Sequence, residues 1–563
     1  MKNQLIECVP NFSEGIRLDV IKEITDQIES VPGIKLLDTD PGQATNRTVV
    51  TFVGPPEAVI EAAFLAIRKA GEIIDMRHHK GAHPRFGATD VCPLVPVAGI
   101  TMDEVVSFAR KLAQRVGEEL AIPVYCYEFA AFEEKRHNLA NVRSGEYEGL
   151  KDKLKDPSWK PDFGPATFNP QTGAIAIGAR NFLVAYNINL NTTSVRRANS
   201  VAFDIREAGR VKREGDPVTG KIVRDKEGNP VKIPGTLKKV KAIGWYIEEY
   251  GIAQISINLT DITVTPVHIA FDETCQKARE RGMRVTGSEL VGLIPLEAML
   301  EAGRHYLRKQ RRSTGIPEKE LIKIAVKSLG LDDLKPFNPK EKIIEYLLAE
   351  NEVNPLAEMD LKSFAEETAS ESPAPGGGSI SAYMGALGAA LATMVANLSS
   401  HKRGWDDRWK EFSDWADRGI QLVNQLTRLV DEDTRAFNRI MEAYGLPKKS
   451  EEEKQKRSQA IEEATLNAIE VPFSVMQKAL ESMDIIRAMA EKGNPNSVSD
   501  AGVAALAARS AVWGAWLNVK INAKGLDDSS RVSEILDQAA DMAARAAADE
   551  KEILEIVNRI IDV

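Results

Sequence analysis

Three of the seven histidines in this chain of 563 residues lie within one short stretch, HHKGAHPRFGATD, at residues 78–90. Lys80 and Arg85 lie in the same stretch, among glycines and a proline. An imidazole titrates near neutral pH, and lysine or arginine binds carboxylates. Three interpretations follow: a metal site, a solvated basic loop, or a loop in which one histidine is a general base and the cations hold an anionic substrate.

The ligand pattern disfavours a metal site here. His78 and His79 are adjacent and therefore point apart on an extended chain, and no carboxylate or cysteine completes a plausible ligand set nearby. No HExxH motif occurs in the sequence. We therefore expect no metal, and the choice between a solvated loop and a general base depends on the rest of the chain.

Length, charge and cysteine usage narrow the class of protein. A chain of 563 residues should form about three structural units, because single cores stop growing near ~250–300 residues. The 73 basic and 82 acidic residues give a net charge of −9, without a long basic run that would favour a nucleic-acid partner. Four cysteines without CxxC spacing and an N-terminus without a signal-peptide pattern predict a cytoplasmic protein with free thiols and a small-molecule partner.

The chain changes character near residue 350. Before that point, short strand patterns alternate with helical patterns, and the order β-α-β-β-α-β occurs twice. After it, only helical patterns remain. We predict a multidomain protein with two α/β lobes of ferredoxin-like order, then a linker and an all-α helical bundle, at residues 1–180, 181–348, 349–357 and 358–563.

The second lobe carries two unusual features. Residues 211–235 are charged and rich in turn signals, and we expect a hairpin excursion there. Two strands each carry polar side chains on one face, which predicts either a binding face for a flat polar heterocycle or amino acid, or an ordinary wet sheet face. These side chains are Asn187, Asn189 and Asn191 on one strand and Gln254, Ser256, Asn258 and Thr260 on the other.

One uncharged segment of twenty residues, 379–398, has the length of a membrane span. It is rich in alanine, and no aromatic belt or basic flank anchors both ends, so we predict a buried helix and no membrane span. Small residues at spacings of four, three and four would let a neighbouring helix or a ligand approach its backbone closely. They are Ser381, Gly385, Gly388 and Ala392.

The motif ESPAPGGGS, residues 371–379, precedes that helix. Its prolines prevent helix formation and its glycines permit close backbone approach, while Ser379 is suited to cap the helix. Backbone N–H groups at a helix N-terminus bind anions. We therefore expect substrate binding by Gly376, Gly377, Gly378 and Ser379.

Asp433 interrupts an apolar stripe on the first long helix of the second half. The stripe consists of Leu422, Leu426, Leu429, Ala436 and Ile440, at spacings of three and four. This phase places Asp433 in the apolar seam and turns Asp431 and Glu432 away from it. A carboxyl group in such a seam should have a raised pKa and hold or give a proton; the alternative is a structural aspartate bonded to a neighbouring helix.

Several motifs together carry a resemblance to a known family. In the first half they are ECVPNFSEG (7–15), ATNRTVVTFVGPPE (44–57), HHKGAHPRFGATDVCP (78–93), SGEYEGL (144–150), WKPDFGP (159–165) and SELVGLIP (288–295). In the second half they are ESPAPGGGS, LVDEDTRAF (429–437) and NVKIN (518–522). The first half resembles glutamate formimidoyltransferase and the second resembles formimidoyltetrahydrofolate cyclodeaminase, in the order of the bifunctional family. The excursion at 211–235 is longer than the corresponding segment of the animal members of the family.

The resemblance implies transfer of a formimidoyl group between N-formimidoylglutamate and N5 of tetrahydrofolate, the co-substrate, in histidine degradation. It assigns the catalytic base to His83, and we add Lys80 and Arg85 for substrate carboxylates and Asp40 for the pteridine side. It also implies a homo-oligomer and a folate-binding segment. That segment consists of Gly164, Pro165, Ala166, Thr167, Phe168, Asn169, Pro170, Gln171, Thr172 and Gly173.

The resemblance implies a second reaction, in which folate N10 attacks the formimidoyl carbon, ammonia leaves and 5,10-methenyltetrahydrofolate forms. The acid for the leaving nitrogen falls on Asp433, which the helical periodicity had indicated independently. Two alternatives remain for the helical half: it could be a methenyltetrahydrofolate cyclohydrolase, or it could serve only as an oligomerisation module.

Overall fold

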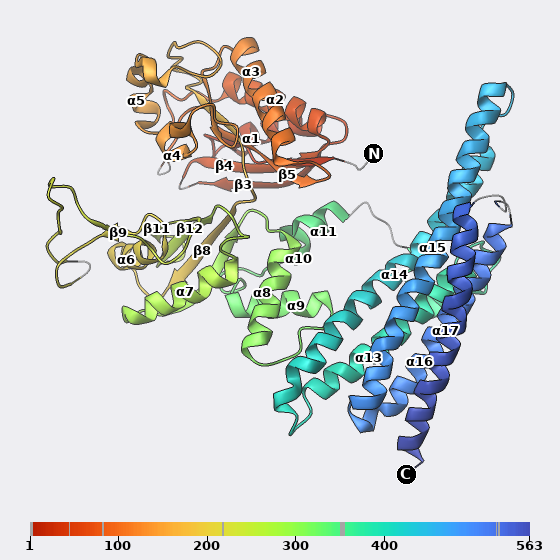
Figure 1. Cartoon of the computed structure of the whole chain (residues 1–563). Coiled ribbons are helices and arrows are strands. Elements are labelled where there is room, and N and C mark those ends of the chain that lie inside the picture. Colours follow the sequence, from red (N-terminus) through yellow and green to blue (C-terminus); the bar gives the residue numbers. More distant parts are fainter. Residues whose placement is uncertain are drawn as a thin grey trace. The chain divides into compact units, whose positions relative to one another are not determined.

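The computed structural model describes residues 4–43, 45–81, 84–216, 219–349, 355–524, 526 and 530–562. Its chain forms two compact units (Figure 1). The α/β unit comprises Met1–Met299 and Leu329–Leu348, and the helical unit comprises Leu300–Ser328 and Ala349–Val563. The predicted fold class, α/β lobes followed by an all-α bundle, is confirmed.

The first lobe contains a seven-stranded sheet whose core has ferredoxin-like order, β3-β4-β1-β5, with antiparallel neighbours. Strands β7 and β6 extend this core in parallel beyond β5. The strands are β1 (Leu5–Cys8), β2 (Asn11–Phe12), β3 (Lys35–Gly42), β4 (Arg47–Gly54), β5 (Thr89–Ala98), β6 (Val124–Glu128) and β7 (Ile175–Ala179).

Helices cover both faces of this sheet. Ile6 and Cys8 of β1 point into the core beneath the three long helices, so Glu7 points to the opposite face, because successive strand residues alternate. A smaller core on that opposite face joins Tyr125 to Leu150 of a short helix. The helices are α1 (Leu18–Glu29), α2 (Pro56–Ile73) and α3 (Met102–Glu119) on the first face, and α4 (Leu139–Val142) and α5 (Glu146–Lys153) on the second.

The second lobe repeats the ferredoxin-like order in an antiparallel sheet, β11-β12-β8-β13. Its excursion forms the expected hairpin, in which β9 pairs with β10. The strands are β8 (Val184–Leu190), β9 (Arg210–Val211), β10 (Lys232–Ile233), β11 (Val240–Ile247), β12 (Ile252–Leu259) and β13 (Val285–Val291). The helices here and after the lobe are α6 (Val195–Ile205), α7 (Val267–Glu280), α8 (Leu296–Lys309), α9 (Glu318–Leu329), α10 (Pro339–Lys342) and α11 (Ile344–Ala349).

The polar face of the second lobe is buried where β8 and β12 pair. Asn189 and Gln254 are fully buried, and the Gln254 amide donates to Oδ1 of Asn189 at 2.8 Å. Asn187 is 5% exposed and donates to Glu289 at 3.4 Å. The interpretation as an ordinary solvent-exposed face is therefore wrong for these three side chains. Asn258, which lies on β12 together with Gln254, is exposed.

The helical unit is a bundle of long helices around an alanine-rich core. The small residues of α13 face its neighbours, as expected for close packing: Gly385 lies against Leu426, Ala479 and Ala511. Helix α13 is long and apolar enough to cross a membrane, with a mean hydropathy of 1.5, yet 61% of its apolar window is buried inside the protein. The helices are α12 (Leu361–Thr368), α13 (Gly377–Ser400), α14 (Trp409–Gly445), α15 (Glu451–Lys492), α16 (Val498–Ala523) and α17 (Ser530–Ile561).

Helix α15 continues through Pro472. Proline has no N–H, so the carbonyl of Ala468, four residues earlier, loses its usual helical donor. The side chain of Asn522 on α16 donates to that carbonyl at 2.8 Å. A side chain of the neighbouring helix thus satisfies the group that the proline leaves unpaired.

The segment 300–328 packs within the helical unit. The Thr314 N–H donates to Oγ of Ser413 at 3.1 Å, and the Thr314 hydroxyl donates to Asp417 at 2.6 Å. The carbonyl of Gly315 accepts from the Asn397 amide at 2.8 Å. These contacts assign 300–328 to the helical unit, whereas the linker at 349–357 falls largely on residues outside the described ranges and stays a prediction.

Candidate active sites

The histidine-rich loop is fixed by the turn between β3 and β4. The Asn46 amide donates to the carbonyl of Lys80 at 2.8 Å, and Nε2 of His79 donates to the carbonyl of Asn46 at 2.8 Å. Nδ1 of His79 accepts from Nε of Arg85 at 3.1 Å, which requires a neutral imidazole. Burial lowers the pKa of His79, and the positive charge of Arg85 lowers it further. His79 is therefore a structural part of the loop.

The cations of this loop differ in how firmly they are held. Arg85 pairs with Glu148 at 2.5 Å and lies 3.8 Å from Glu146, so a substrate carboxylate must compete with these acids. Lys80 is exposed and makes no ion pair within the described ranges. His83, the predicted base, lies outside the described residues.

His78 is 83% exposed, 3.9 Å from Asp75. In the part of the chain that the structure describes, which omits His83, no group of three His, Cys, Asp or Glu side chains is placed to hold a metal ion.

A buried ionic cluster beside the loop was missed by the sequence analysis. Asp90, which is fully buried, accepts hydrogen bonds from Arg47 and from Arg143, the latter at 2.8 Å. Burial lowers the pKa of Arg47, and the Asp90 carboxylate opposes that change. Arg47 also donates to Oδ1 of Asn11 at 3.1 Å and reaches the carbonyl of Pro84. The sequence signals were separate: Asp90 ends the HHKGAHPRFGATD motif, and Arg47 lies in the motif ATNRTVVTFVGPPE.

Asp40 lies on β3 opposite Val49, half-buried. Its neighbour on the same face, Asp38, lies 3.9 Å from Lys342. Burial raises the pKa of Asp38; Lys342 opposes this and Asp40 adds to it. No hydrogen bond or ion pair between described residues joins Asp40 to the histidine-rich loop, so its predicted role on the pteridine side stays a prediction.

The segment from Gly164 to Gly173 is a loop in which both glycines have positive φ, +79° and +66°. Part of its backbone is already used: Asn169 accepts from the N–H groups of Gln171 and Gly173, at 2.9 Å each. The N–H groups of residues 166–168 have no partner among the described residues. The N–H groups of Gly164 and Asn169 also have no partner among the described residues, so these parts of the predicted folate-binding segment keep free amides for a ligand.

Glu7 is a buried acid that the sequence analysis did not single out. It is 5% exposed on the opposite face of β1 from the main core. Burial raises the pKa of Glu7 to about 7, although the positive charge of Arg180 opposes the rise. Glu7 can therefore exchange a proton near neutral pH.

The second site lies where α13 begins beside α14. Oδ2 of Asp433 is 3.2 Å from Oγ of Ser379, whose hydroxyl also donates to the carbonyl of Val430 at 2.8 Å. Burial raises the pKa of Asp433, and hydrogen bonds from Ser379 oppose the rise. Gly378 makes room for the acid, because a Cβ there would lie 2.1 Å from Oδ1 of Asp433. The site thus holds a carboxyl group that is suited to carry a proton.

One detail of the predicted site was wrong and another was incomplete. Asp431 was expected to turn away from the apolar seam, and the structure adds that it is not exposed to solvent: it is 2% exposed and accepts the N–H groups of Leu356 and Ala357, at 3.0 Å each. Ser379 does not cap α13, because the helix begins at Gly377 with Gly376 as its N-cap. Ser379 lies inside the first turn, where its side chain reaches α14 instead.

The glycine-rich start of α13 keeps the expected anion-binding potential. The first N–H groups of an α-helix have no acceptor within the helix, so those of Gly377 and Gly378 are available to a ligand, whereas that of Ser379 bonds Asp433. Asn518 of α16 lies close to Gly377, 3.5 Å from the position that a Cβ would take. The N-terminal end of α13 therefore carries a cluster of polar and backbone groups. It consists of Gly376, Gly377, Gly378, Asp433 and Asn518.

The fold and these two sites define an enzyme that combines an α/β unit with a separate helical unit carrying an acidic site. The chain belongs to the formimidoyltransferase-cyclodeaminase family, because it is 43% identical over 550 residues to the formimidoyltransferase-cyclodeaminase of Rattus norvegicus. That match covers 96% of this chain and 98% of the relative.

The family models match the chain in the same order. The formiminotransferase domain, N-terminal subdomain, matches residues 5–180, the formiminotransferase domain 185–349 and formiminotransferase-cyclodeaminase 360–541. The glutamate formimidoyltransferase of Thermoplasma acidophilum is 40% identical and covers 57% of this chain and 98% of itself. The methenyltetrahydrofolate cyclohydrolase of Methylorubrum extorquens is 40% identical and covers 35% of this chain and 95% of itself.

Proposed function

We propose that this chain catalyses two consecutive folate reactions. The first transfers the formimidoyl group between N-formimidoyl-L-glutamate and N5 of tetrahydrofolate. The second cyclises 5-formimidoyltetrahydrofolate to 5,10-methenyltetrahydrofolate and releases ammonia. The observation that carries the proposal is the collinear match over 96% of this chain to relatives that are named for both activities.

In the transfer, N5 of tetrahydrofolate attacks the amidine carbon, and the bond from that carbon to the glutamate nitrogen breaks. The attacking nitrogen loses a proton and the leaving nitrogen gains one. We assign this proton transfer to His83. Asn46 and the neutral His79 hold the loop on which it lies, and the cluster of Arg47 and Asp90 lies beside the loop.

In the cyclisation, N10 attacks the formimidoyl carbon, and the bond from that carbon to the terminal nitrogen breaks. The amino nitrogen leaves as neutral ammonia only after it is protonated, because the amide ion is a very poor leaving group. Asp433 supplies that proton, since burial favours its protonated form. The outward N–H groups at the start of α13 are suited to bind an anionic part of the folate.

A coupled assay tests both steps. Formimidoylglutamate and tetrahydrofolate are mixed with the enzyme, and the absorbance of methenyltetrahydrofolate and the released ammonia are measured together. Equal yields of the two products support the proposal. The similarity to a cyclohydrolase favours one alternative, in which the helical half is a methenyltetrahydrofolate cyclohydrolase. In that case the enzyme should hydrolyse added methenyltetrahydrofolate and release no ammonia from formimidoyltetrahydrofolate.

The pathway, compartment, co-substrate and partners are proposed from the same two reactions. We place the protein in histidine degradation and one-carbon metabolism in the cytoplasm, with tetrahydrofolate as co-substrate, no metal and no nucleic-acid partner. Activity that survives chelation by EDTA supports the metal-free assignment. Fractionation of the source cells tests the compartment.

We also propose that the chain forms a homo-oligomer through an apolar face of α13 and α16, which pack against each other. Monomers rarely leave a contiguous apolar patch exposed. Light scattering should give a mass above that of one chain, and Leu398→Glu with Leu517→Glu should lower it. The large apolar side chains that these two helices expose are Leu387, Met394 and Leu398 of α13 and Val503, Leu506, Trp513, Leu517 and Ile521 of α16.

The domain boundaries are proposed at 180, 348 and 358, as the sequence pattern predicts, although residues 300–328 pack within the helical unit. Fragments 1–350 and 356–563 should each fold and keep one activity. The second fragment lacks the Thr314 contacts of Ser413 and Asp417, so it should melt at a lower temperature than the same unit in the full chain. Two inactive, insoluble fragments would contradict the boundary.

A further inference from the structure

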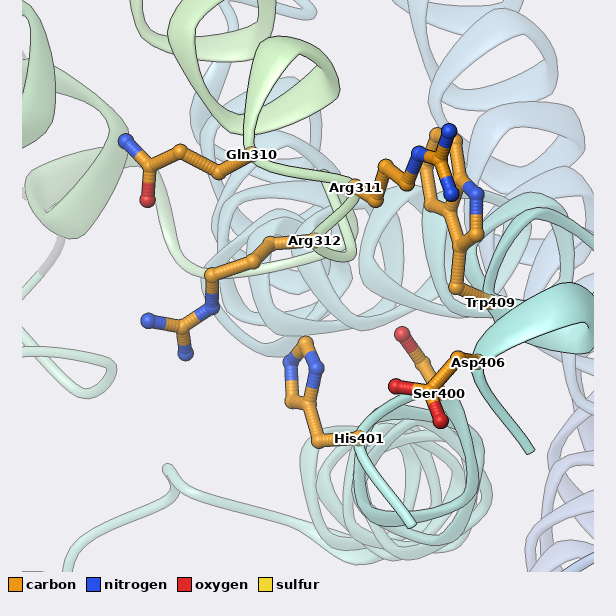
Figure 2. Close-up of a pocket in the computed structure, with 7 residues that line it drawn as sticks. All are labelled: Gln310, Arg311, Arg312, Ser400, His401, Asp406 and Trp409. Atoms are coloured by element: carbon orange, nitrogen blue, oxygen red, sulfur yellow. The ribbon is translucent and has the colours of Figure 1, made fainter. Parts of the chain in front are cut away.

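A cavity of about 480 Å³ lies in the helical unit at the C-terminal end of α13 (Figure 2). The acid site lies at the other end of this helix, so about 35 Å of helix separates the two, at 1.5 Å per residue. The cavity is therefore distinct from the site of Asp433. Its lining residues are Gln310, Arg311, Arg312, Ser400, His401, Asp406 and Trp409.

The lining carries a net positive charge. Arg311 and Arg312 lie on the loop that follows α8, both exposed, and neither makes an ion pair with another described residue. Asp406 is the single acidic residue among the seven that line the cavity. Two guanidinium groups thus share the cavity with one carboxylate, and arginine binds oxyanions well because of its planar array of donors.

Ser400 presents a hydroxyl group without a partner. The residue is 4% exposed, and its Oγ makes no hydrogen bond within the described ranges. Figure 2 shows this hydroxyl directed into the space between His401 and the loop that bears the arginines. A buried polar group is usually hydrogen-bonded, so an oxyanion in this space would supply the missing acceptor.

His401 responds to the positive charge of the cavity. Burial lowers the pKa of His401, and the neighbouring Arg312 lowers it further. Arg311, Arg312 and Asp406 are the other charged groups of the lining. An anion between His401 and Arg312 would offset their repulsion and favour the protonated imidazole.

The backbone at Arg311 is also unusual. Its φ is +53°, and the N–H of Arg312 donates to the carbonyl of Leu307 at 3.0 Å, so Arg311 occupies the left-handed position that ends α8. Glycine is favoured at such a position, and other residues cost roughly 1 kcal/mol there. Glycine is thus the suitable replacement for removing the side chain without harming the loop.

We propose that this arginine cavity binds a small oxyanion, with a sulfate, phosphate or carboxylate group as the recognised element. Arg311 and Arg312 hold its oxygens, Ser400 donates a hydrogen bond to it, and His401 adds a further cation when protonated. The site lies at the opposite end of α13 from Asp433 and is distinct from the proposed site of cyclisation.

Sulfate is the best probe, because its charge stays at −2 across neutral pH. Hydrogen exchange of the full chain is followed by mass spectrometry in sodium sulfate and in sodium chloride of equal ionic strength. Sulfate should slow exchange in peptides covering 310–313 and 400–406, with saturation, while chloride should not. No sulfate-specific protection in these peptides would overturn the proposal.

Variants then assign the effect to the cavity. Arg311→Gly and Arg312→Gln should each weaken sulfate binding roughly tenfold or more, because each removes a charged hydrogen-bond donor. Arg311→Gly should be at least as stable as the parent. The matched control is Arg403→Gln, which removes an exposed charge nearby from a residue outside the lining. Equal protection in the parent and in Arg312→Gln would place the sulfate elsewhere.

A pH series tests His401. Sulfate affinity should rise as pH falls from 8 to 6, because the bound anion favours the imidazolium and sulfate itself does not titrate in this range. His401→Gln should bind with an affinity that changes little over the same range. A parent protein whose affinity does not change with pH would remove His401 from the proposed site.

Discussion

The hydroxyl of Ser379 lies 3.2 Å from Oδ2 of Asp433 and 2.8 Å from the carbonyl oxygen of Val430. A hydroxyl has one proton to donate. The hydroxyl therefore donates to either the Val430 carbonyl or the Asp433 carboxyl group at one time, and hydrogen bonds from Ser379 to Asp433 favour the ionised carboxylate. Burial raises the pKa of Asp433 against this effect and favours an acid that holds its proton.

Replacing Asp433 with asparagine should separate chemistry from stability. Asparagine keeps the shape and can donate to Ser379, but it cannot give up a proton to the leaving nitrogen. Ammonia release should fall by roughly 10² or more, while formimidoyl transfer stays at the parent rate. The free energy of unfolding should change by less than about 1–2 kcal/mol. Both rates and the melting temperature are measured on one preparation.

Asp431→Asn is the matched contrast, two residues away on the same helix. The Asp431 carboxylate accepts two backbone N–H groups from residues 356 and 357, and an amide can accept only one of them well. This variant should lose about 1–3 kcal/mol of stability and release ammonia normally while folded. A stable Asp433→Asn protein with the parent rate of ammonia release would exclude Asp433 from the mechanism.

Gly378→Ala should disable the same acid by a steric route. The added Cβ would lie 2.1 Å from Oδ1 of Asp433, so the carboxyl group must move. Ammonia release should drop at least tenfold, on the scale of a misplaced catalytic group, and transferase activity should not change. Gly445→Ala is the control, because nothing lies within 4 Å of its Cβ position. Equal loss in both variants would point to a general effect on the bundle.

The sequence predicted both α/β lobes correctly because local patterns determine them. Strands alternate in polarity with period two, and the β-α-β-β-α-β order allows few topologies. Asp431 shows where this approach fails. The apolar stripe of α14 describes one packing face, but a long helix contacts different elements around its circumference. The segment at residues 356–357 binds Asp431 from a side that no periodicity in α14 reveals.

The buried cluster in the first lobe could not be predicted for a related reason. Arg47, Asp90 and Arg143 come from β4, β5 and the segment after α4, and are far apart in sequence. No local spacing connects them, because the sheet register brings the first two together and a helix on its second face brings the third. The histidine-rich loop was found from composition alone, since its chemistry lies within thirteen residues.

The assignment of the transferase base is tested with two histidine variants. His83→Ala should lower the transferase rate by on the order of 10² to 10⁴ and leave ammonia release from formimidoyltetrahydrofolate intact. His78→Ala should have a milder effect, because that side chain is 83% exposed. Full transferase activity without His83, or a larger loss without His78, would mean that the base is another residue.

The last prediction concerns Glu7 and the pH dependence of stability. The pKa of Glu7 is raised to about 7 in the folded protein by burial, against roughly 4.3 in an unfolded chain. The folded state therefore binds a proton more tightly. Its stabilising contribution is fully present below pH ~4.3 and is lost as pH rises through about 7. The loss amounts to roughly 3 kcal/mol at pH 8 if the full shift applies.

Glu7→Gln should remove this pH-dependent loss of stability, because glutamine resembles the protonated acid and does not ionise. The melting temperature of the α/β unit in the variant should match the parent at pH 4, exceed it increasingly as pH rises to about 7, and keep that lead at pH 8. Glu118→Gln, at an exposed position in the same unit, should show a constant difference across the series. If the Glu7→Gln curve runs parallel to the parent from pH 5 to 8, then Glu7 ionises freely in the folded protein and its burial does not control the proton.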